Sequence, residues 1–329
     1  MTMTYRSVGK SGLMVSAVGI GGNNFGRAHT QTETQEGTNA VVRAALEEGI
    51  TTFDLADVYG KEPGLSETMF GKALREVGER ARDVVVITKF GMDMQGRNGA
   101  DYGARGSRRY VARALDASLR RLGVEAIDLY FYHTPDGVTP AEETLEALSD
   151  AVRAGKIRYY ATSNHAGWQL ADASHLAAGR GLVGPVATES HYNLIDRRAE
   201  LEVVPAAQRF GLGIFPYFPL ANGLLTGKYR RGEAPEGSRI AHSKATLLES
   251  TDWDQIEAFV AFAQARGLTP VQVAMSWLAS RPCVASVIAG ATTPQQVRQN
   301  AASLVWEPSS ADLAELDAIF PPPEKVALF

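Results

Sequence analysis

The segment VVVITKF, residues 84–90, places four consecutive branched apolar residues before a threonine and a lysine. Branched side chains favour strands, and an apolar run without polar alternation is typical of a strand that is covered on both faces. Such strands occur in parallel sheets with helices packed on them. The segment therefore predicts a central strand of an α/β protein that ends in a charged side chain.

Similar short runs recur on both sides of this segment, giving eight in all: Val15–Gly19, Ile50–Phe53, Val84–Thr88, Ile127–Phe131, Ile157–Thr162, Val186–Glu189, Gly213–Phe215 and Ser286–Ile288. Most are separated by segments with the apolar spacing of helices: Thr38–Glu48, Glu67–Glu76, Arg108–Leu122, Glu142–Ala154, Trp168–Ala178 and Glu200–Phe210. Alternating strands and helices imply parallel pairing, and eight such units close a (β/α)8 TIM barrel. We expect one barrel domain over residues 1–329, preceded by an N-terminal β-hairpin in Tyr5–Ser16.

Two long connections are rich in glycine and polar residues. Gly91–Gly106 follows the third predicted strand, and Ala221–Leu248 lies between the last two. In a barrel, the connections that follow strands lie at the C-terminal face, where active sites are built. We therefore expect both to be functional loops at that face.

Composition limits the classes of partner. The net charge is −4 with basic residues scattered along the chain, which argues against a nucleic-acid partner. Cys283 is the only cysteine, so no intrachain disulfide can form. No apolar run approaches the length of a membrane span, and the first residues lack the apolar core of a secretory signal. We expect a cytoplasmic protein without membrane contact, and nothing in the sequence indicates an oligomeric state.

Two glycine motifs are rejected as nucleotide-binding signatures. Gly9-Lys10-Ser11 resembles a phosphate-binding loop, but Thr4 occupies the position that requires glycine. The run Gly19–Asn24 breaks the dinucleotide fingerprint at its third glycine. No metal site is expected either, because the histidines form no zinc-binding pair and a lone cysteine cannot build a thiolate site.

Four titratable residues stand at successive strand ends. Asp54 and Tyr59 follow the second predicted strand, while Lys89 and His133 end the third and follow the fourth. Each alone has an ordinary explanation as a helix cap, a packed loop residue or a solvated charge. Together they lie on one rim of the predicted barrel, which is the arrangement that acid–base catalysis requires.

The segments that carry these residues resemble the active-site signatures of the aldo-keto reductase superfamily: DLADVYG at 54–60, VITKF at 86–90 and DLYFYH at 128–133. The resemblance continues at residues 12–16, 157–164, 192–195, 219–229 and 290–296, so it covers nearly the whole chain. Within the superfamily, the sequence looks most like the branch that includes potassium-channel β subunits and bacterial general reductases.

The resemblance implies a reductase that binds NADPH across the C-terminal face. Tyr59 would donate the proton, Asp54 would hold Lys89 charged, and His133 would orient the substrate carbonyl. Because a nearby ammonium favours the phenolate, we expect Lys89 to lower the pKa of Tyr59 from its usual value of about 10. The small-molecule substrate would be an aldehyde or a ketone.

The same resemblance implies a set of cofactor-binding residues: Gly22, Asn23, Asp54, Ser163, Asn164, Glu189, Tyr217, Phe218, Pro219, Leu220, Lys228, Arg239, Gly290, Thr292, Gln296, Gln299 and Asn300. Ser163 and Asn164 would bind the nicotinamide carboxamide, and Tyr217 would stack on the ring unless it is a core aromatic. The residues from Gly290 onward would surround the adenosine, where Thr293 is also expected to cap a helix. The substrate pocket would be lined by Asn24, Phe25, Phe90 and Trp168, of which Trp168 could instead pack on a helix.

Three features depart from the family pattern. Glu189 stands where glutamine is usual, and we hypothesise that it favours the oxidised cofactor or has a pKa raised by burial. Phe218 replaces a serine. Gly290 and Gln296 stand where some members carry basic residues for the 2′-phosphate of NADP. We nevertheless expect NADP rather than NAD, because Lys228 and Arg239 supply positive charge.

Two functions of different class remain. The first is a carbonyl reductase, and the second is an NADPH-binding regulatory or sensor subunit with little turnover. Retention of all four catalytic residues favours the reductase. The same residues argue against an unrelated barrel with a phosphate site after its last strands.

Overall fold

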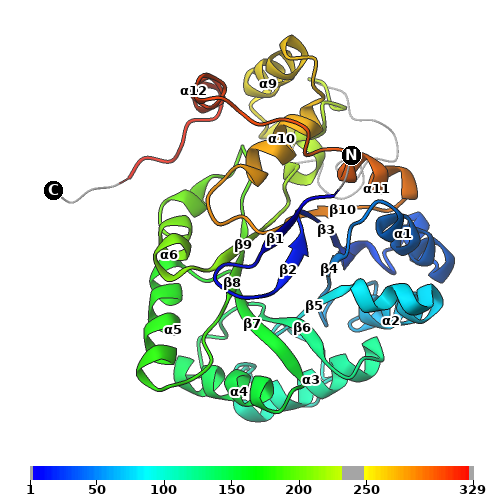
Figure 1. The fold of residues 1–329 in the computed structure, drawn as a ribbon, viewed down its shortest axis with the longest axis vertical. Coiled ribbons are helices and arrows are strands. Elements are labelled where there is room, and N and C mark those ends of the chain that lie inside the picture. The colour runs from blue at the N-terminus through cyan, green and yellow to red at the C-terminus, as the bar shows by residue number, and fades with distance from the viewer. Residues whose placement is uncertain (1–2, 232–247, 326–329) are drawn as a thin grey trace.

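A computed structural model describes residues 3–231 and 248–325 and confirms the (β/α)8 barrel (Figure 1). All the strands of the barrel sheet pair in parallel, in the order β10-β3-β4-β5-β6-β7-β8-β9. Their bounds are β3 (Val18–Gly21), β4 (Thr52–Asp54), β5 (Val85–Phe90), β6 (Ile127–Tyr132), β7 (Ile157–Ser163), β8 (Ala187–His191), β9 (Gly213–Tyr217) and β10 (Val287–Gly290).

The seam between β9 and β10 is closed by the segment that enters β10. Ile214 in β9 donates a backbone hydrogen bond to Cys283 at 2.7 Å and accepts one from Ala285 at 2.9 Å. The two edge strands are thereby joined, so that the sheet curves back on itself. Parallel strands in a closed sheet all end at the same rim.

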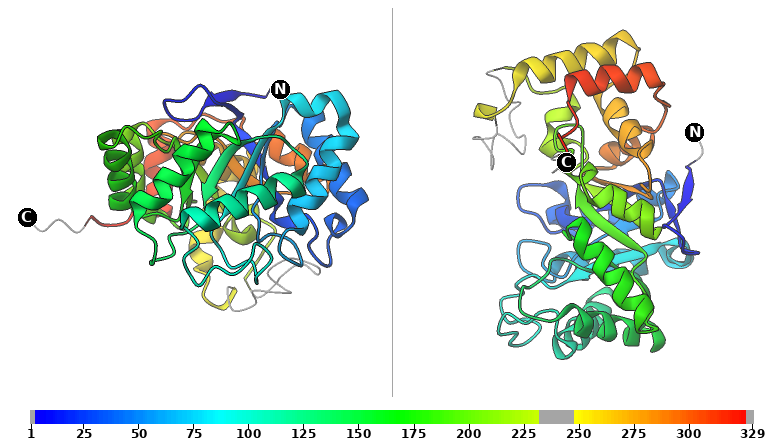
Figure 2. Two further views of the ribbon diagram at one scale, coloured as in Figure 1. Left: turned by 90° about the horizontal axis from the view of Figure 1, so that it is seen from below. Right: turned by 90° about the vertical axis from the view of Figure 1, so that its left-hand side faces the viewer.

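Helices surround the sheet (Figures 1 and 2). They are α1 (Gln35–Glu47), α2 (Leu65–Val77), α3 (Arg108–Leu122), α4 (Ala141–Arg153), α5 (Gly167–Gly179), α6 (Val203–Phe210), α10 (Pro270–Ala279) and α11 (Pro294–Ala301). Two further helices, α9 (Trp253–Ala265) and α12 (Ser310–Ile319), lie side by side outside this ring. Arg266 joins them through an ion pair of 2.7 Å with Asp312.

The barrel interior and the helix layer form separate apolar clusters. The interior cluster includes Ile87, Leu129 and Phe131, and its floor is closed by Val8 and Val15 of the N-terminal hairpin. That hairpin pairs β1 (Tyr5–Ser7) with β2 (Met14–Ser16) in antiparallel register. The predicted hairpin is therefore confirmed, and it plugs the end of the barrel opposite the strand ends that carry the candidate residues.

The main error in the predicted elements concerns the first strand. The run Val15–Gly19 was expected to be one strand, but Ser16 ends the hairpin and the barrel strand starts at Val18. The Ser16 hydroxyl donates to the Val18 carbonyl at 2.7 Å and the Ser16 amide donates to the Thr52 hydroxyl at 3.0 Å. These local bonds turn the chain between the hairpin and the barrel. By contrast, α3 has the predicted bounds, with Ser107 capping its start and Gly123 at its end.

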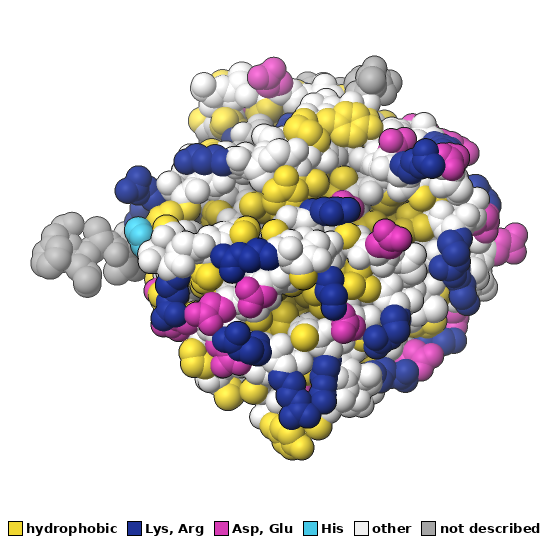
Figure 3. Space-filling view, turned by 60° about the horizontal axis from the view of Figure 1, so that its bottom comes forward, with side chains coloured by type: hydrophobic (Ala, Val, Ile, Leu, Met, Phe, Trp, Pro, Cys, Tyr) yellow, Lys and Arg dark blue, Asp and Glu magenta, His cyan; other side chains and the backbone are white. Residues whose placement is uncertain are grey.

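The two long connections contain little regular structure. Residues 91–106 form turns without a helix or strand, and residues 221–226 form a short 3₁₀ helix. Most of the predicted loop Ala221–Leu248 lies outside the described residues. Among helices within residues 3–231 and 248–325, none is long and apolar enough to span a membrane. Acidic and basic side chains are interspersed on the face shown in Figure 3.

A substitution at Gly9 tests how the hairpin plug docks. Gly9 has φ +56°, and an added Cβ would lie 2.7 Å from the Gly213 nitrogen and 2.9 Å from the Val186 carbonyl oxygen. Gly78 has a similar φ of +59°, but its Cβ would meet nothing. Left-handed geometry alone costs an alanine about 1 to 2 kcal/mol. We expect Gly9→Ala to lower the free energy of unfolding clearly more than Gly78→Ala, measured by chemical denaturation, and equal losses would contradict the docking described here.

Candidate active site at the C-terminal rim

The Lys89 ammonium lies at the centre of a buried charge cluster. Its side chain is fully buried on β5, where it donates a hydrogen bond to the Asp54 carboxylate and another, of 2.9 Å, to the Leu55 carbonyl oxygen. The second carboxylate, Glu189 on β8, places Oε2 3.2 Å from Nζ. One cation therefore has an acidic group from each of two strands beside it.

Tyr59 and His133 stand next to this cluster. Lys89 Nζ lies 5.4 Å from the centre of the Tyr59 ring, and the Tyr59 and His133 rings meet edge to face with centroids 5.9 Å apart. His133 follows β6 directly, and its amide donates to the Phe90 carbonyl at 2.8 Å. The structure thus brings all four residues predicted to be catalytic into one group.

Backbone bonds fix the loop that carries Tyr59. The amides of Leu55 and Asp57 donate to the carbonyls of Ile87 and Lys89, at 2.9 and 3.0 Å. At the other end of the loop, the Ser66 amide donates to the Tyr59 carbonyl at 3.1 Å, and Ser66 lies in the first turn of α2. The loop is therefore held to β5 on one side and to α2 on the other, which fixes where Tyr59 leaves the backbone.

Lys89, Asp54 and Glu189 shift one another's pKa values, and burial shifts all three. Burial acts to lower the pKa of Lys89, but the Asp54 and Glu189 carboxylates outweigh it and raise that pKa above the ordinary value. Burial raises the pKa of Asp54, against the opposing effect of Lys89. Burial and the charge of Asp54 raise the pKa of Glu189 to about 8. Lys89 is therefore charged at neutral pH. Glu189 holds its proton at pH values below about 8.

Tyr59 differs from the expectation that Lys89 makes it more acidic. Burial raises the pKa of Tyr59 well above its usual value, the Lys89 ammonium acts to lower it, and the carboxylates of Asp54 and Glu189 raise it again. The prediction of a lowered pKa is wrong for this site, because burial of the hydroxyl outweighs the Lys89 ammonium, although the ammonium does act in the predicted direction. Tyr59 consequently keeps its proton throughout the physiological pH range.

His133 is a neutral group in this site. Its side chain is buried, and burial together with the Lys89 charge lowers its pKa to about 3. Its Nδ1 is buried without a hydrogen-bond partner among the described residues. A neutral imidazole carries one N–H, so His133 can donate a single hydrogen bond.

The residues expected to meet the nicotinamide gather at the ends of β7 and β9. Asn164 has φ +56°, a conformation that asparagine tolerates, and its side chain donates to the Ser163 hydroxyl at 3.1 Å and to the His133 carbonyl at 2.9 Å. The Tyr217 hydroxyl donates to Asn164 Oδ1 at 2.8 Å. Tyr217 is only partly buried, so it is not a core aromatic.

His191 is a site residue that the sequence reasoning missed. It ends β8, two residues after Glu189, and its ring stacks on Tyr217 with centroids 5.4 Å apart and planes 8° from parallel. Its Nδ1 lies 3.1 Å from Asp196 Oδ2. A polar residue at a strand end was the available signal. The Leu55 carbonyl was also missed, and a backbone acceptor leaves no sequence signal at all.

The residues expected at the adenosine end also come together. At the end of β10, the Gly290 carbonyl accepts from Asn300 Nδ2 at 3.3 Å. Gln296 Oε1 accepts from the amide and hydroxyl of Thr292, at 2.7 and 3.0 Å. Thr293 caps α11 by accepting from the Gln296 amide, as predicted. Gln299 is exposed on the same helix.

The remaining candidate cofactor residues line the same rim. Gly22 and Asn23 begin the short 3₁₀ helix after β3, and Phe218, Pro219 and Leu220 follow β9. Phe218 has φ +53°, and its carbonyl accepts from Asn193 at 3.0 Å. Lys228 is exposed, with Nζ 5.2 Å from the centre of the Tyr229 ring. Arg239 lies outside the described residues.

Two of the expected substrate-pocket residues belong to the core instead. Phe25 is fully buried against Phe70, and Phe90 is fully buried between Tyr130 and Tyr132. Both expectations are corrected, because a side chain stacked inside the protein offers no surface to a ligand.

The other two expected pocket residues remain near the rim. Asn24 is nearly buried beside Gly290 and accepts a hydrogen bond from Arg27 at 3.1 Å. Trp168 is 65% exposed in the first turn of α5, so it is not a helix-packing residue.

Comparison with known proteins identifies one matching family and several relatives that align over most of this chain. The profile of the Aldo/keto reductase family matches residues 17–320. A probable voltage-gated potassium channel subunit beta of rice (Oryza sativa subsp. japonica) is 36% identical over 92% of this chain and 91% of its own. The uncharacterized oxidoreductase YrpG of Bacillus subtilis is 36% identical over 98% and 97%. The L-glyceraldehyde 3-phosphate reductase of Escherichia coli K12 is 35% identical over 96% and 92%.

The raised pKa of Glu189 predicts how stability changes with pH. An unfolded glutamate titrates near pH 4.3, whereas Glu189 titrates at about 8 in the folded protein. Between these values the folded state binds the proton more tightly, so the Glu189 contribution to stability falls as pH rises through this window. Glutamine does not titrate. We therefore expect the melting temperature of Glu189→Gln to rise relative to wild type by a few degrees from pH 5 to pH 8.

The matched control is Glu79→Gln, which removes a carboxylate from the exposed pair with Arg82. Its difference from wild type should show no trend of that size over the same pH range. A difference between Glu189→Gln and wild type that stays constant with pH would contradict the buried-carboxylate account.

Proposed function

This chain belongs to the aldo/keto reductase family, and on that premise we propose that it is an NADP(H)-dependent oxidoreductase that reduces aldehydes or ketones to alcohols with Tyr59 as the general acid. The observation that carries the proposal is the buried group of Asp54, Tyr59, Lys89 and His133 at the rim of the barrel. Titratable groups gathered in this way supply a proton donor, a charge beside it and a second hydrogen-bond donor.

The rim residues suit a nicotinamide dinucleotide. A Cβ at Gly22 would lie 3.1 Å from Leu55 and 3.2 Å from the Asp54 carbonyl oxygen, so the chain packs closely at the rim and only glycine fits there. Glu189 Oε2 is buried 3.2 Å from the Lys89 ammonium, and in its protonated form the carboxyl group can donate a hydrogen bond to a carboxamide oxygen. When bound, the reduced nicotinamide would supply the hydride.

Tyr59 would give up its proton only when negative charge develops on the substrate oxygen beside it. Its raised pKa keeps the proton on the hydroxyl until a carbonyl oxygen gains charge. That oxygen, as it becomes an alkoxide, is more basic than a phenolate, so the proton moves to it. The Lys89 ammonium then lies beside the new phenolate and stabilises it.

His133 would hold the substrate oxygen in place. The neutral imidazole has one N–H to donate as a hydrogen bond. Because it is not an imidazolium, it does not replace Tyr59 as the acid. Two donors aimed at one oxygen stabilise negative charge there, as in an oxyanion hole. Trp168, exposed in the first turn of α5, would provide an apolar wall for the rest of the substrate.

The preference for NADP over NAD rests on side chains around the far end of the rim. Gly290, Thr292, Gln296, Gln299 and Asn300 would surround the adenosine. None of them is charged, so Lys228 and Arg239 would supply the positive charge for a 2′-phosphate. We further propose that the chain forms one domain and acts in the cytoplasm on a small carbonyl compound.

One comparison favours a second candidate function. A relative with 36% identity is named as a probable potassium channel subunit beta, which suggests an NADPH-binding regulatory subunit with little turnover. Such a subunit has no need of an acid paired with a buried ammonium. Turnover with carbonyl substrates separates the two candidates.

Replacing the proton donor is the direct test of the mechanism. We expect Tyr59→Phe to lower kcat/KM for aldehydes at least about 100-fold, the lower end of what a general acid contributes. NADPH affinity should stay within about twofold, because the hydroxyl is assigned to the substrate and not to the cofactor. Consumption of NADPH across a panel of aldehydes and ketones, followed by absorbance, measures the first quantity, and fluorescence titration measures the second.

Tyr5→Phe is the matched control, since it removes one hydroxyl from the hairpin at the opposite end of the barrel, where Tyr5 donates to the Gly49 carbonyl. Turnover that survives Tyr59→Phe would refute Tyr59 as the acid. Absence of turnover in wild type across the panel would favour the regulatory subunit.

The cofactor preference is tested at Lys228. We expect Lys228→Ala to weaken NADPH binding about tenfold, because a charge-assisted contact with a phosphate contributes on the order of 1.5 kcal/mol. NADH affinity should stay within about twofold, since that cofactor lacks the 2′-phosphate. Lys156→Ala, which breaks the surface pair with Asp116, is the control. Equal losses for the two cofactors would remove Lys228 from the 2′-phosphate site.

A further inference from the structure

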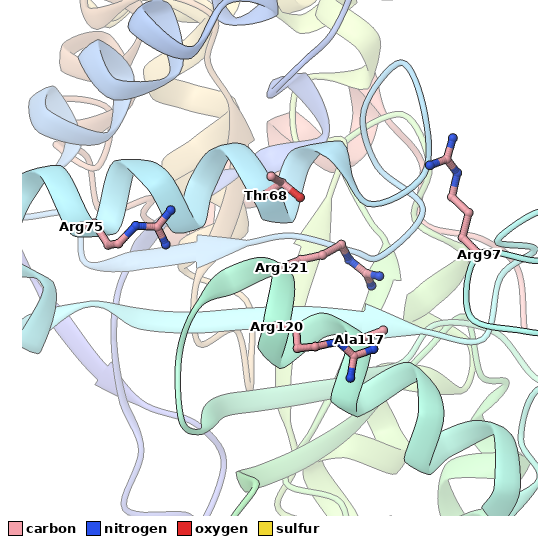
Figure 4. A pocket seen from close by; sticks show the side chains of 6 residues that line it. All are labelled: Thr68, Arg75, Arg97, Ala117, Arg120 and Arg121. Atoms are coloured by element: carbon pink, nitrogen blue, oxygen red, sulfur yellow. The ribbon is translucent and has the colours of Figure 1, made fainter.

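A hollow of about 420 Å³ lies on the flank of the barrel between α2 and α3 (Figure 4). Four of its six lining residues are arginines, Arg75, Arg97, Arg120 and Arg121, and the others are Thr68 and Ala117. Thr68 and Arg75 project from α2, Ala117, Arg120 and Arg121 belong to α3, and Arg97 lies on the loop after β5. Four guanidinium groups around one hollow stand out in a chain whose net charge is −4.

Only two carboxylates are paired with these arginines in the described part of the chain. Arg121 binds the buried Glu67 at 2.6 Å, and Arg97 binds the exposed Glu62 at 2.7 Å. Arg75 and Arg120 are exposed and, within residues 3–231 and 248–325, make no ion pair and no side-chain hydrogen bond. The hollow therefore has an excess of positive charge that the protein itself does not neutralise.

The hollow lies on the helix side of the sheet. Glu67, which binds Arg121, accepts a second hydrogen bond, of 2.7 Å, from the Thr88 hydroxyl on β5. Neighbouring side chains of a strand point to opposite faces, so Thr88 faces the helices while Lys89 faces the barrel interior. The arginine hollow and the Lys89 cluster are thus separated by the thickness of the sheet.

From these observations we propose that the hollow between α2 and α3 binds a small polyanion that carries phosphoryl groups. Guanidinium groups bind phosphoryl oxygens through paired hydrogen bonds, and several of them around one concavity select for more than one negative charge. Ala117 presents only a methyl group to the hollow, which leaves room for the ligand. Arg121 is held in place by Glu67, Asn98 and Ser118, so part of the site is formed before a ligand arrives.

The arrangement has to be distinguished from a purely structural role of the arginines. Arg75 and Arg120 lie in the last turns of α2 and α3, where a cation also stabilises the helix end. Arg209 also lies in the last turn of its helix, α6, is exposed, and is likewise unpaired among the described residues. It is therefore a control with the same charge near a helix end.

The test is calorimetric titration of inorganic pyrophosphate into the full-length protein at low salt, with saturating NADPH present to occupy the cofactor site. We expect saturable binding that weakens as salt is added. Arg75→Glu and Arg120→Glu should each raise the Kd for pyrophosphate at least about tenfold, whereas Arg209→Glu should change it less than about twofold. Melting temperatures without pyrophosphate report the structural role separately, and Arg120→Ala serves where a charge reversal prevents folding.

Three results would overturn the proposal. They are absence of saturable heat with wild type, saturable heat that appears only when NADPH is omitted, and a loss of affinity in Arg209→Glu as large as in Arg75→Glu. The first two would leave no pyrophosphate site outside the cofactor site, and the third would assign the binding to the overall charge of the molecule. None of them bears on carbonyl reduction, which is measured by the Tyr59 variant.

Discussion

The arrangement of the rim depends on one buried cation. Taking an ammonium out of water costs several kcal/mol, and the cost is recovered only where carboxylates and carbonyls surround the charge closely. Lys89 has such partners in Asp54 at the end of β4, the Leu55 carbonyl in the loop that follows β4, and Glu189 on β8. Those strands are distant in the sheet order, so the contact exists only when the barrel is closed. The charge cluster therefore depends on the closure of the sheet.

Closure also explains why the site residues come from so many segments. In a closed parallel sheet, every strand delivers the residues that follow it to one rim. The loop after β4 supplies Tyr59, the end of β6 supplies His133, and the ends of β7 and β9 supply Asn164 and Tyr217. At the opposite end, the hairpin plug keeps water from the interior cluster on which Lys89 rests.

Periodicity was sufficient to predict the barrel, because each strand is a short apolar run and most of the segments between the strands have apolar residues at helical spacing. It was insufficient at Ser16, where hydrogen bonds to Val18 and Thr52 end one strand and start another within a continuous apolar run. The candidate rim residues could be predicted from position and resemblance. The sequence could not predict whether an aromatic residue faces a ligand or the core. Phe90, for example, is fixed by stacking with Tyr130 and Tyr132, which only the folded sheet brings next to it.

The electrostatics of the site could not be read from neighbouring residues one at a time. A lysine beside a tyrosine suggests an acidic phenol, but burial of the Tyr59 hydroxyl outweighs the Lys89 ammonium, and the charges of Asp54 and Glu189 oppose the ammonium further. Protonation of Glu189 changes that balance, since it removes one of the two opposing carboxylates. The acidity of Tyr59 is thereby coupled to the protonation of Glu189 across the Lys89 ammonium. A glutamine at position 189, which the family resemblance leads us to expect there, would hold the charge balance permanently in the state that glutamate reaches only when protonated.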